Sequence, residues 1–356
     1  MRHILRVLIG LTALGVLLLL IGPLWAPVQA VVWQPPHNAG LTGAFAPNRA
    51  LAAISMSPVG FAPEHVACDE IGNLYTGIEG GAILRRDLDG TWQTLGNTGG
   101  RPLGLRADNA GGVWVADSVK GILHVDAGGV ITSLVTEHEG QPLKFVDDLD
   151  VDGSGNIWFS DASMRYDYRQ VGLDFFEGSR TGRLLRYDAA SQQTEVMLEG
   201  LFFANGVTLG PEQRYVLVNE TGMGRVHRLW LEGERAGESD IFVDALPGTP
   251  DNIRFDGLDT FWIALPALRD AIDAMAPLPR LRALLSYLPL HWIEALAVPE
   301  TFVVAVNLNG AVVHNLQDQN NAFHYITGVT PCGDHLYLGS LKANGIGILP
   351  KPRGNS

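Results

Sequence analysis

Gly155-Asn156-Ile157-Trp158-Phe159-Ser160-Asp161, followed after a connection by Arg183-Leu184-Leu185-Arg186-Tyr187-Asp188, is the stretch of this sequence that decides the fold. Each segment has the length of a β-strand and is rich in aromatic and aliphatic residues, with turn residues around it. The pair therefore predicts two neighbouring strands of one sheet. Comparable pairs occupy residues 74–77 with 83–87 and residues 113–117 with 122–126.

The same strand pattern recurs along the chain. It can be marked by one residue in each repeat: Leu74, Val113, Ile157, Tyr215, Phe261 and Leu336. The repeats are about 40 to 57 residues apart up to the fifth, a period that is typical of propeller blades with four strands each. We therefore predict an all-β fold, a six-bladed β-propeller formed by residues 46–350.

Oxygen-bearing side chains occupy one position in four of these repeats. Ten residues before Leu74, Ile157, Tyr215 and Phe261 the sequence has Glu64, Asp147, Asn205 and Asp251, whereas the other two repeats have Leu103 and Ile326. Equal offsets in a closed ring of repeats place equivalent residues around its axis. Carboxylate and amide oxygens without thiolates form a hard-ligand site, which favours Ca²⁺.

The fifth repeat is longer than the others because it contains residues 266–300. This segment has a helical pattern that is interrupted by Pro277, Pro279 and Pro289. We expect a helical insertion in the fifth blade, acting as a lid over the central channel, as a patch resting on a bilayer, or as a cap on the outer rim. The third repeat also has a long connection that contains four aromatic residues: Tyr166, Tyr168, Phe175 and Phe176. We expect them to anchor this loop by hydrophobic contacts; the alternative is that they line a substrate entrance.

The N-terminal residues predict a membrane anchor. Residues 4–25 are apolar and carry no charge after Arg6, which is long enough to span a bilayer. Arg2 and Arg6 precede this segment, and the next basic residue is Arg49, so the positive-inside rule places residues 1–3 in the cytosol and the propeller on the far side, in a periplasm, a lumen or the exterior. A cleaved signal peptide ending near Ala30 is the alternative. Residues 26–45 are expected to be a linker and residues 351–356 a tail.

Charge and cysteine content exclude several classes of function. The formal net charge is −13 and no basic run occurs, so we expect no nucleic-acid partner. Two cysteines, Cys68 and Cys332, cannot form a disulfide framework or a zinc site. Since they fall in the first and the last repeat, a disulfide between the two ends of the ring is one interpretation; we favour two buried thiols without a bond.

Four motifs resemble those of a known family. They are Pro63-Glu64-His65-Val66, Phe145-Val146-Asp147-Asp148-Leu149, Phe203-Ala204-Asn205-Gly206-Val207 and Gly248-Thr249-Pro250-Asp251-Asn252-Ile253. These motifs are similar to those of the strictosidine synthase-like family, which includes proteins like the adipocyte plasma membrane-associated protein. The family is part of the clan of gluconolactonases of the senescence marker (SMP-30) type and paraoxonases. The resemblance covers roughly residues 45–350 and implies a six-bladed propeller with a catalytic Ca²⁺ in its channel.

The resemblance also implies roles for individual residues. It assigns Glu64, Asn205 and Asp251 as calcium ligands, with Asn252 close by. Asp147 departs from the family pattern, and as a further carboxylate it would tighten calcium binding while weakening the Lewis acidity of the ion. His65 stands where paraoxonases have an acidic residue for a second calcium, which argues against a second ion here.

These features predict a calcium-dependent hydrolase of lactones or aryl esters. Asp251 or Asp147 is the expected general base, since clustered carboxylates raise one another's pKa. The alternative is a non-catalytic propeller that serves as a binding platform, because the fold alone does not define an activity. Strictosidine synthase-type condensation is disfavoured, since residues 322–334 contain no glutamate at the place where the condensing member of the family has one.

Overall fold

The computed structural model describes residues 22–320 and 323–352. The predicted membrane anchor, residues 4–25, therefore lies almost wholly outside the described residues; its last residues form the short 3₁₀-helix η1 (Gly22–Trp25). Among the described residues, no helix is both long enough and apolar enough to cross a membrane.

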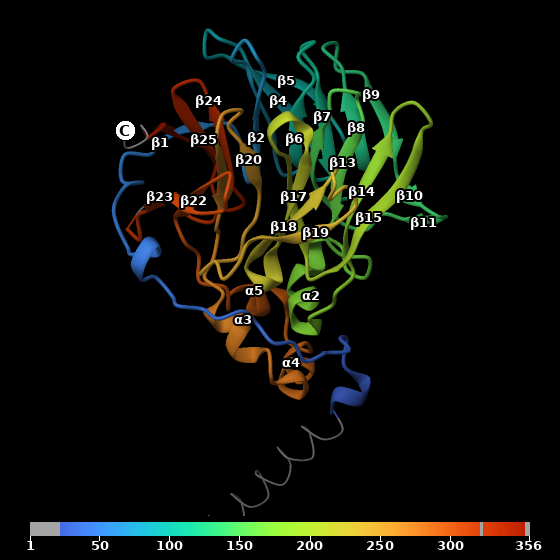
Figure 1. The fold of residues 1–356 in the computed structure, drawn as a ribbon, viewed down its shortest axis with the longest axis vertical. Helices are drawn as coiled ribbons and strands as arrows, with labels where there is room; N and C mark the ends of the chain where they lie inside the picture. Colours follow the sequence, from blue (N-terminus) through green and yellow to red (C-terminus); the bar gives the residue numbers. More distant parts are fainter. Residues whose placement is uncertain (1–21, 321–322, 353–356) are drawn as a thin grey trace, which may run out of the picture.

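Six four-stranded antiparallel sheets form the propeller that the sequence predicts (Figure 1). The first blade contains β2 (Val66–Cys68), β3 (Leu74–Gly77), β4 (Ala82–Arg86) and β5 (Trp92–Asn97), and the second β6 (Pro102–Ala107), β7 (Val113–Asp117), β8 (Gly121–Val125) and β9 (Ile131–Val135). The third contains β12 (Val146–Val151), β13 (Ile157–Asp161), β14 (Gly182–Asp188) and β15 (Gln193–Leu201), and the fourth β16 (Ala204–Leu209), β17 (Tyr215–Glu220), β18 (Arg225–Trp230) and β19 (Ser239–Val243). The fifth contains β20 (Ile253–Phe255), β21 (Thr260–Ala264), β22 (Phe302–Asn307) and β23 (Val312–Gln317). A small ribbon of β10 (Glu137–His138) and β11 (Gln141–Pro142) joins the second blade to the third.

The sixth blade closes the ring with strands from both ends of the chain. It consists of β24 (Ile326–Cys332), β25 (His335–Ser340), β26 (Gly345–Pro350) and, as its outermost strand, β1 (Ser55–Pro58). Because β1 precedes the first blade in sequence, its pairing with β26 locks the last blade to the first. The strand pattern did not single out β1, since it is short and mostly exposed.

The two cysteines correct one of our expectations. Cys68 and Cys332 form a disulfide, with 6.2 Å between their Cα atoms, rather than two buried thiols. Both residues end the innermost strand of a blade, β2 and β24, and these blades are neighbours only because the ring closes. The disulfide thus provides a second closure, nearer the axis than the pairing of β1 with β26.

Apolar side chains fill the spaces between blades. One buried cluster combines Leu217 and Val226 of the fourth blade with Phe261 and Phe302 of the fifth, and comparable clusters lie at the other five blade interfaces. The strands are hydrophobic on both faces because each sheet is sandwiched between two others. These interfaces hold the inner strands, and therefore the residues of the channel, in fixed positions.

Helices cover one end of the propeller. The insertion in the fifth blade lies between β21 and β22, as predicted, and contains α3 (Asp270–Met275), α4 (Pro279–Leu285) and α5 (Leu290–Glu294). A helix that we did not predict, α2 (Val171–Glu177), forms in the long connection of the third blade after the 3₁₀-helix η3 (Tyr168–Gln170). Figure 1 shows these helices together at one end. Shorter 3₁₀-helices are η2 (Gly43–Phe45), η4 (Pro211–Gln213) and η5 (Thr221–Met223).

The segment that was expected to be a linker packs against these helices. Trp33 is buried against Phe202, with 5.1 Å between ring centroids, and the guanidinium of Arg282 lies 4.3 Å from the centre of the Trp33 ring. Arg282 also donates hydrogen bonds to the carbonyls of Val31 and Phe176. The N-terminal segment is thus tied to both α2 and α4.

Removing the disulfide should destabilise the ring. Exchanging both Cys68 and Cys332 for Ser is expected to lower the free energy of unfolding by about 2–5 kcal/mol, because the cross-link restricts a long loop of the unfolded chain. The measurement is denaturant unfolding with and without a reductant. The native protein should lose stability when reduced, whereas the double variant should not respond; equal sensitivity of both would contradict the disulfide.

Candidate metal centre

Three carboxylates from three blades meet at the axis. Glu64 precedes β2, Asp147 lies in β12 and Asp251 precedes β20, and one oxygen from each lies within 4.8 Å of the others. Their exposed fractions are 2%, 4% and 9%. The offset that was read from the sequence therefore does correspond to one place in the fold.

The two amides that were predicted as ligands belong to the same cluster. The side chain of Asn205 lies beside the carboxylate of Asp251, and the Nδ2 atom of Asn252 donates to Oε1 of Glu64 and to the carbonyl of Thr327. The two repeats without an oxygen ligand contribute the buried apolar residues Leu103 and Ile326. All five predicted residues are brought together, and their role as ligands stays a prediction.

Irregular pairing of the inner strands shapes this hub. The register between the first two strands of a blade shifts between Val146 and Leu149 in the third blade and between Ala204 and Val207 in the fourth. A bulge of this kind bends the strand locally and changes the direction of nearby side chains. Asp147 faces the cavity, while its neighbour Asp148 contacts the next blades.

Glycines allow the backbones to approach closely around the site. A Cβ atom on Gly339 would lie 1.9 Å from the carbonyl oxygen of Glu64, and one on Gly206 would lie 2.5 Å from the carbonyl oxygen of Asp251. Thr327 uses its hydroxyl to donate a 2.7 Å hydrogen bond to the Glu64 carbonyl. The backbone at Glu64 and at Asp251 is therefore held by the adjoining blade.

Burial and mutual repulsion raise the pKa of all three carboxyls. Burial, followed by the nearby charge of Asp148, raises the pKa of Glu64 to about 8. Burial and the charge of Glu64 raise the pKa of Asp147 and of Asp251 well above the usual value for aspartate. Without a cation, the cluster therefore retains protons at neutral pH.

The cluster also has the oxygen atoms that a cation requires. Three buried side-chain oxygens have no hydrogen-bond partner: Oε2 of Glu64, Oδ1 of Asn205 and Oδ1 of Asn252. Unpaired buried acceptors are costly, and a hard divalent cation such as Ca²⁺ satisfies several of them at once. The five residues thus fit Ca²⁺ in donor type and in charge.

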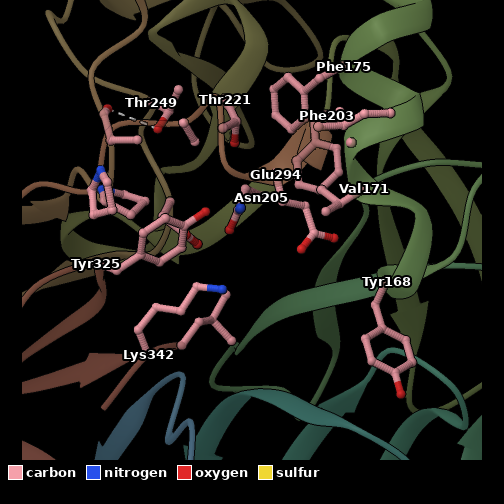
Figure 2. A pocket seen from close by; sticks show the side chains of 18 of the residues that line it. Tyr168, Val171, Phe175, Phe203, Asn205, Thr221, Thr249, Glu294, Tyr325 and Lys342 are labelled. Atoms are coloured by element: carbon pink, nitrogen blue, oxygen red, sulfur yellow. Dashed lines mark hydrogen bonds between the residues drawn. The ribbon is translucent and has the colours of Figure 1, made fainter. Parts of the chain in front are cut away.

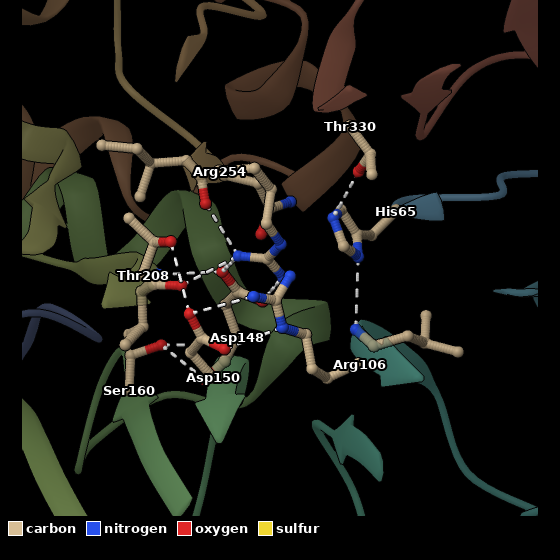
Figure 3. Close-up of polar contacts among 12 residues, drawn as sticks. His65, Arg106, Asp148, Asp150, Ser160, Thr208, Arg254 and Thr330 are labelled. Carbon is tan, nitrogen blue, oxygen red and sulfur yellow. Dashed lines mark hydrogen bonds and ion pairs between the residues drawn. The ribbon is translucent and has the colours of Figure 1, made fainter. Parts of the chain in front are cut away.

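A buried ion pair between Asp148 and Arg254 links three blades (Figure 3). Asp148 accepts hydrogen bonds from Nη1 and Nη2 of Arg254 at 2.7 and 2.5 Å, and from the backbone N–H of Val207 at 2.8 Å. Since Asp148, Val207 and Arg254 belong to the third, fourth and fifth blades, the pair joins their inner strands. The two charges of this pair offset each other, so the pair supplies no net positive charge to the three neighbouring acids.

His65 has a structural role between blades. Its Nδ1 atom accepts a hydrogen bond from the backbone N–H of Leu105 at 3.3 Å, so the proton is on Nε2, which lies 3.1 Å from the hydroxyl of Thr330. Burial lowers its pKa well below the usual value for histidine. A neutral His65 therefore bridges the first blade to the second and the sixth.

The carboxylates open into a cavity of about 730 Å³ under the helices. Figure 2 shows Phe175 and Phe203 on one side of this pocket and Tyr325 and Lys342 on the other, with Asn205 between them. Residues of α2, α3 and α5 complete the wall. Three of the four aromatic residues in the third-blade connection, Tyr168, Phe175 and Phe176, line the cavity, which makes this connection part of the pocket and not only an anchor.

Two lining residues were missed by the sequence reasoning. Arg101 is buried and pairs with Glu79 at 3.1 Å. Its charge acts to lower the pKa of Glu64 and Asp147, but burial outweighs this effect and both pKa values are raised. Tyr325 has a left-handed backbone, with φ of 59°, and its pKa is raised to about 12 by burial and by the charge of Asp251. Neither residue shares a motif or the repeat offset with the acids, so no sequence signal identified them.

Comparisons with known proteins agree with this architecture. The family model for strictosidine synthase matches residues 147–234, and the model for the N-terminal part of strictosidine synthase-like proteins matches residues 43–86. Protein strictosidine synthase-like 4 of Arabidopsis thaliana is 36% identical over 287 residues, which are 78% of this chain and 76% of the relative. The adipocyte plasma membrane-associated protein of Gallus gallus is 32% identical over 87% of this chain and 80% of its own length. The chain belongs to the strictosidine synthase-like family.

Solved structures with the same fold are much more distant in sequence. A gluconolactonase from Xanthomonas campestris superposes with a TM-score of 0.62 at 16% identity, covering 92% of this chain and 98% of its own. The calcium-binding protein regucalcin from Agrobacterium tumefaciens gives a TM-score of 0.56 at 14% identity, covering 82% and 90%. These likenesses establish the propeller fold.

The stability of the metal-free protein should fall as the pH rises from about 5 to 8. The folded state keeps protons on the three acids in this range, whereas the unfolded chain has released them, so the folded state binds more protons and loses stability with rising pH. Thermal unfolding in a chelator measures this. Asp251→Asn should flatten the dependence and Glu199→Gln, an exposed acid on β15, should leave it unchanged; a flat profile of the native protein would contradict the raised pKa values.

Proposed function

We propose that this chain is a calcium-dependent hydrolase of lactones or aryl esters. The observation that carries the proposal is the cluster of three buried carboxylates within 4.8 Å, which opens into a largely apolar cavity of about 730 Å³. A cavity of this size accommodates a small-molecule substrate. The charge at its floor and the aromatic residues of its walls suit a carbonyl compound with an apolar body.

Glu64, Asp147, Asn205, Asp251 and Asn252 would hold the ion. Bound Ca²⁺ would supply Lewis-acid polarisation of the substrate carbonyl and electrostatic stabilisation of the developing oxyanion. The ring of blades supplies a rigid arrangement of these side chains, so that little reorganisation is needed when charge develops.

Asp147 or Asp251 would accept the proton of the attacking water. Both carboxylates face the cavity, and both lie close to other negative charges that favour uptake of a proton. The apolar side chains with which α2, α3 and α5 line the cavity would exclude bulk water from the substrate. The buried and neutral His65 is hydrogen-bonded at both ring nitrogens to groups of the neighbouring blades, and we assign it a structural role rather than a part in proton transfer.

Membrane association accompanies this proposal. The relatives include adipocyte plasma membrane-associated proteins, and residues 4–25 of this chain have the composition of a transmembrane segment. We propose a single-pass anchor with residues 1–3 in the cytosol and the propeller on the far side. The disulfide between Cys68 and Cys332 supports an oxidising compartment for the propeller.

The hydrolase proposal predicts loss of turnover on removal of calcium. Phenyl acetate and a lactone panel should be hydrolysed by the full chain with Ca²⁺ and not in a chelator. Asp251→Asn should weaken calcium binding by about 100-fold, since losing a charged partner in a buried cluster costs about 3 kcal/mol. Calorimetry and a continuous ester assay measure both effects.

A matched control separates binding from catalysis. Glu199→Gln removes an equally charged but exposed side chain and should change neither calcium affinity nor turnover. If the native protein binds calcium tightly and yet hydrolyses none of a broad ester and lactone panel, the hydrolase proposal is wrong and a binding platform is the better description. In that case Asp147→Asn and Asp251→Asn should differ from the native protein only in their affinity for calcium.

A further inference from the structure

Exposed apolar side chains gather at the helical end of the molecule. Among the described residues, nine of the twenty large apolar side chains that are exposed fall within two short stretches, residues 24–32 and 278–298. We call these nine side chains the helical-end patch: Leu24, Trp25, Val31, Val32, Leu278, Tyr287, Trp292, Leu296 and Val298. The remaining ones, such as Ile71, Leu88 and Leu258, are spread over the rest of the propeller.

The two stretches lie side by side although they are far apart in sequence. The hydroxyl of Tyr287 donates a 3.1 Å hydrogen bond to the carbonyl of Gly22 in η1, and Arg282 donates to the carbonyl of Val31. Figure 1 places α3, α4, α5 and the start of the described chain at the same end of the propeller. The patch is therefore a feature of one end of the molecule.

The patch is poor in charge. Residues 24–32 contain no charged side chain, and residues 278–298 contain only Arg280, Arg282 and Glu294, of which Arg282 is buried. Both of the most exposed tryptophans, Trp25 at 74% and Trp292 at 58%, belong to it. Tryptophan and tyrosine prefer the boundary between lipid headgroups and acyl chains, because they combine an apolar ring with a polar tip.

We propose that the helical-end patch rests on the surface of a lipid bilayer, with Trp292, Tyr287 and Leu278 seated at the level of the headgroups. The sequence that precedes Gly22 supports this occupant, because residues 4–21 are apolar and carry only one charge, Arg6, so that the chain enters the patch from a segment suited to lipid. The patch would thus extend the contact of the chain with the membrane from a single segment to a face of the folded domain.

The helical-end patch and the cavity share part of their residues. Helix α5 carries Trp292 in the patch and Glu294 in the wall of the pocket, and Leu296 belongs to both. The pocket therefore lies directly behind the face that contacts lipid. The docking proposal itself does not depend on the proposed hydrolysis, and its test does not use turnover.

Fluorescence quenching by brominated lipids tests the proposal on the full chain in nanodiscs. Trp25→Phe first removes the tryptophan next to the predicted anchor. The remaining fluorescence should be partly quenched when the acyl chains carry bromine, and this quenching should disappear in the Trp25→Phe, Trp292→Phe double variant. Adding Trp92→Phe instead, a change on the outer strand β5, should leave the quenching in place.

A pair of charge variants provides the matched control. In the Trp25→Phe background, Leu278→Glu should reduce the quenching of Trp292 several-fold. Leu258→Glu, which changes an even more exposed leucine in the turn between β20 and β21, should not. Absence of quenching in the Trp25→Phe protein, or an equal effect of the two leucine changes, would overturn the proposal. Protection of Trp292 from acrylamide only in discs that hold two copies would assign the face to a second copy instead.

Discussion

Closure of the ring is the constraint on which the rest of the structure depends. Glu64 stands at the start of the first blade, yet the groups that hold it come from the fifth and sixth blades: the amide of Asn252 and the hydroxyl of Thr327. Two links fasten this junction, the pairing of β1 with β26 and the disulfide between Cys68 and Cys332. If the ring opened, one carboxylate of the cluster would move away from the other two. The junction between the first and the sixth blade is therefore important both for the stability of the fold and for the geometry of the candidate metal centre.

Two kinds of buried acid lie near the axis of the propeller, and they differ in the groups that surround them. Asp148 has a bidentate arginine and a backbone N–H within hydrogen-bond distance, which compensates the loss of water around its charge. Its neighbour Asp147 faces the cavity beside two further carboxylates, and the charge of Arg101 offsets only part of the repulsion. Adjacent residues with the same side chain thus have opposite surroundings, because successive side chains of a strand point to opposite sides.

The repeat offset predicted much of this from sequence, because a ring of blades converts equal spacing into a common position. The strand pattern and its offset identified the six blades and four of the five residues that meet at the axis, the helical pattern identified the insertion of the fifth blade, and the family resemblance added Asn252. They did not identify β1, because a short exposed strand has no strong pattern, nor the disulfide, because its formation depends on how closely two inner strands approach. Arg101 and Tyr325 escaped for a related reason: their approach to the acids results from tertiary packing and, for Tyr325, from a left-handed backbone that sequence does not reveal.

The N-terminal segment packs against the helical end of the propeller. Residues 26–45 were expected to be a linker, and two buried arginines hold part of this segment against the helices. Arg282 donates to the carbonyls of Val31, Met275, Phe176 and Ala276, and Arg269 donates to those of Pro36 and His37. Among the described residues, Arg282 has no carboxylate partner; burial lowers its pKa to about 10, which leaves it charged at neutral pH and bound to carbonyl oxygens alone. Because the same guanidinium contacts the N-terminal segment, α2 and α4, a displacement of this segment must be transmitted to the helices above the cavity. The cover of the pocket and the path of the chain towards its N-terminus are therefore one packed unit.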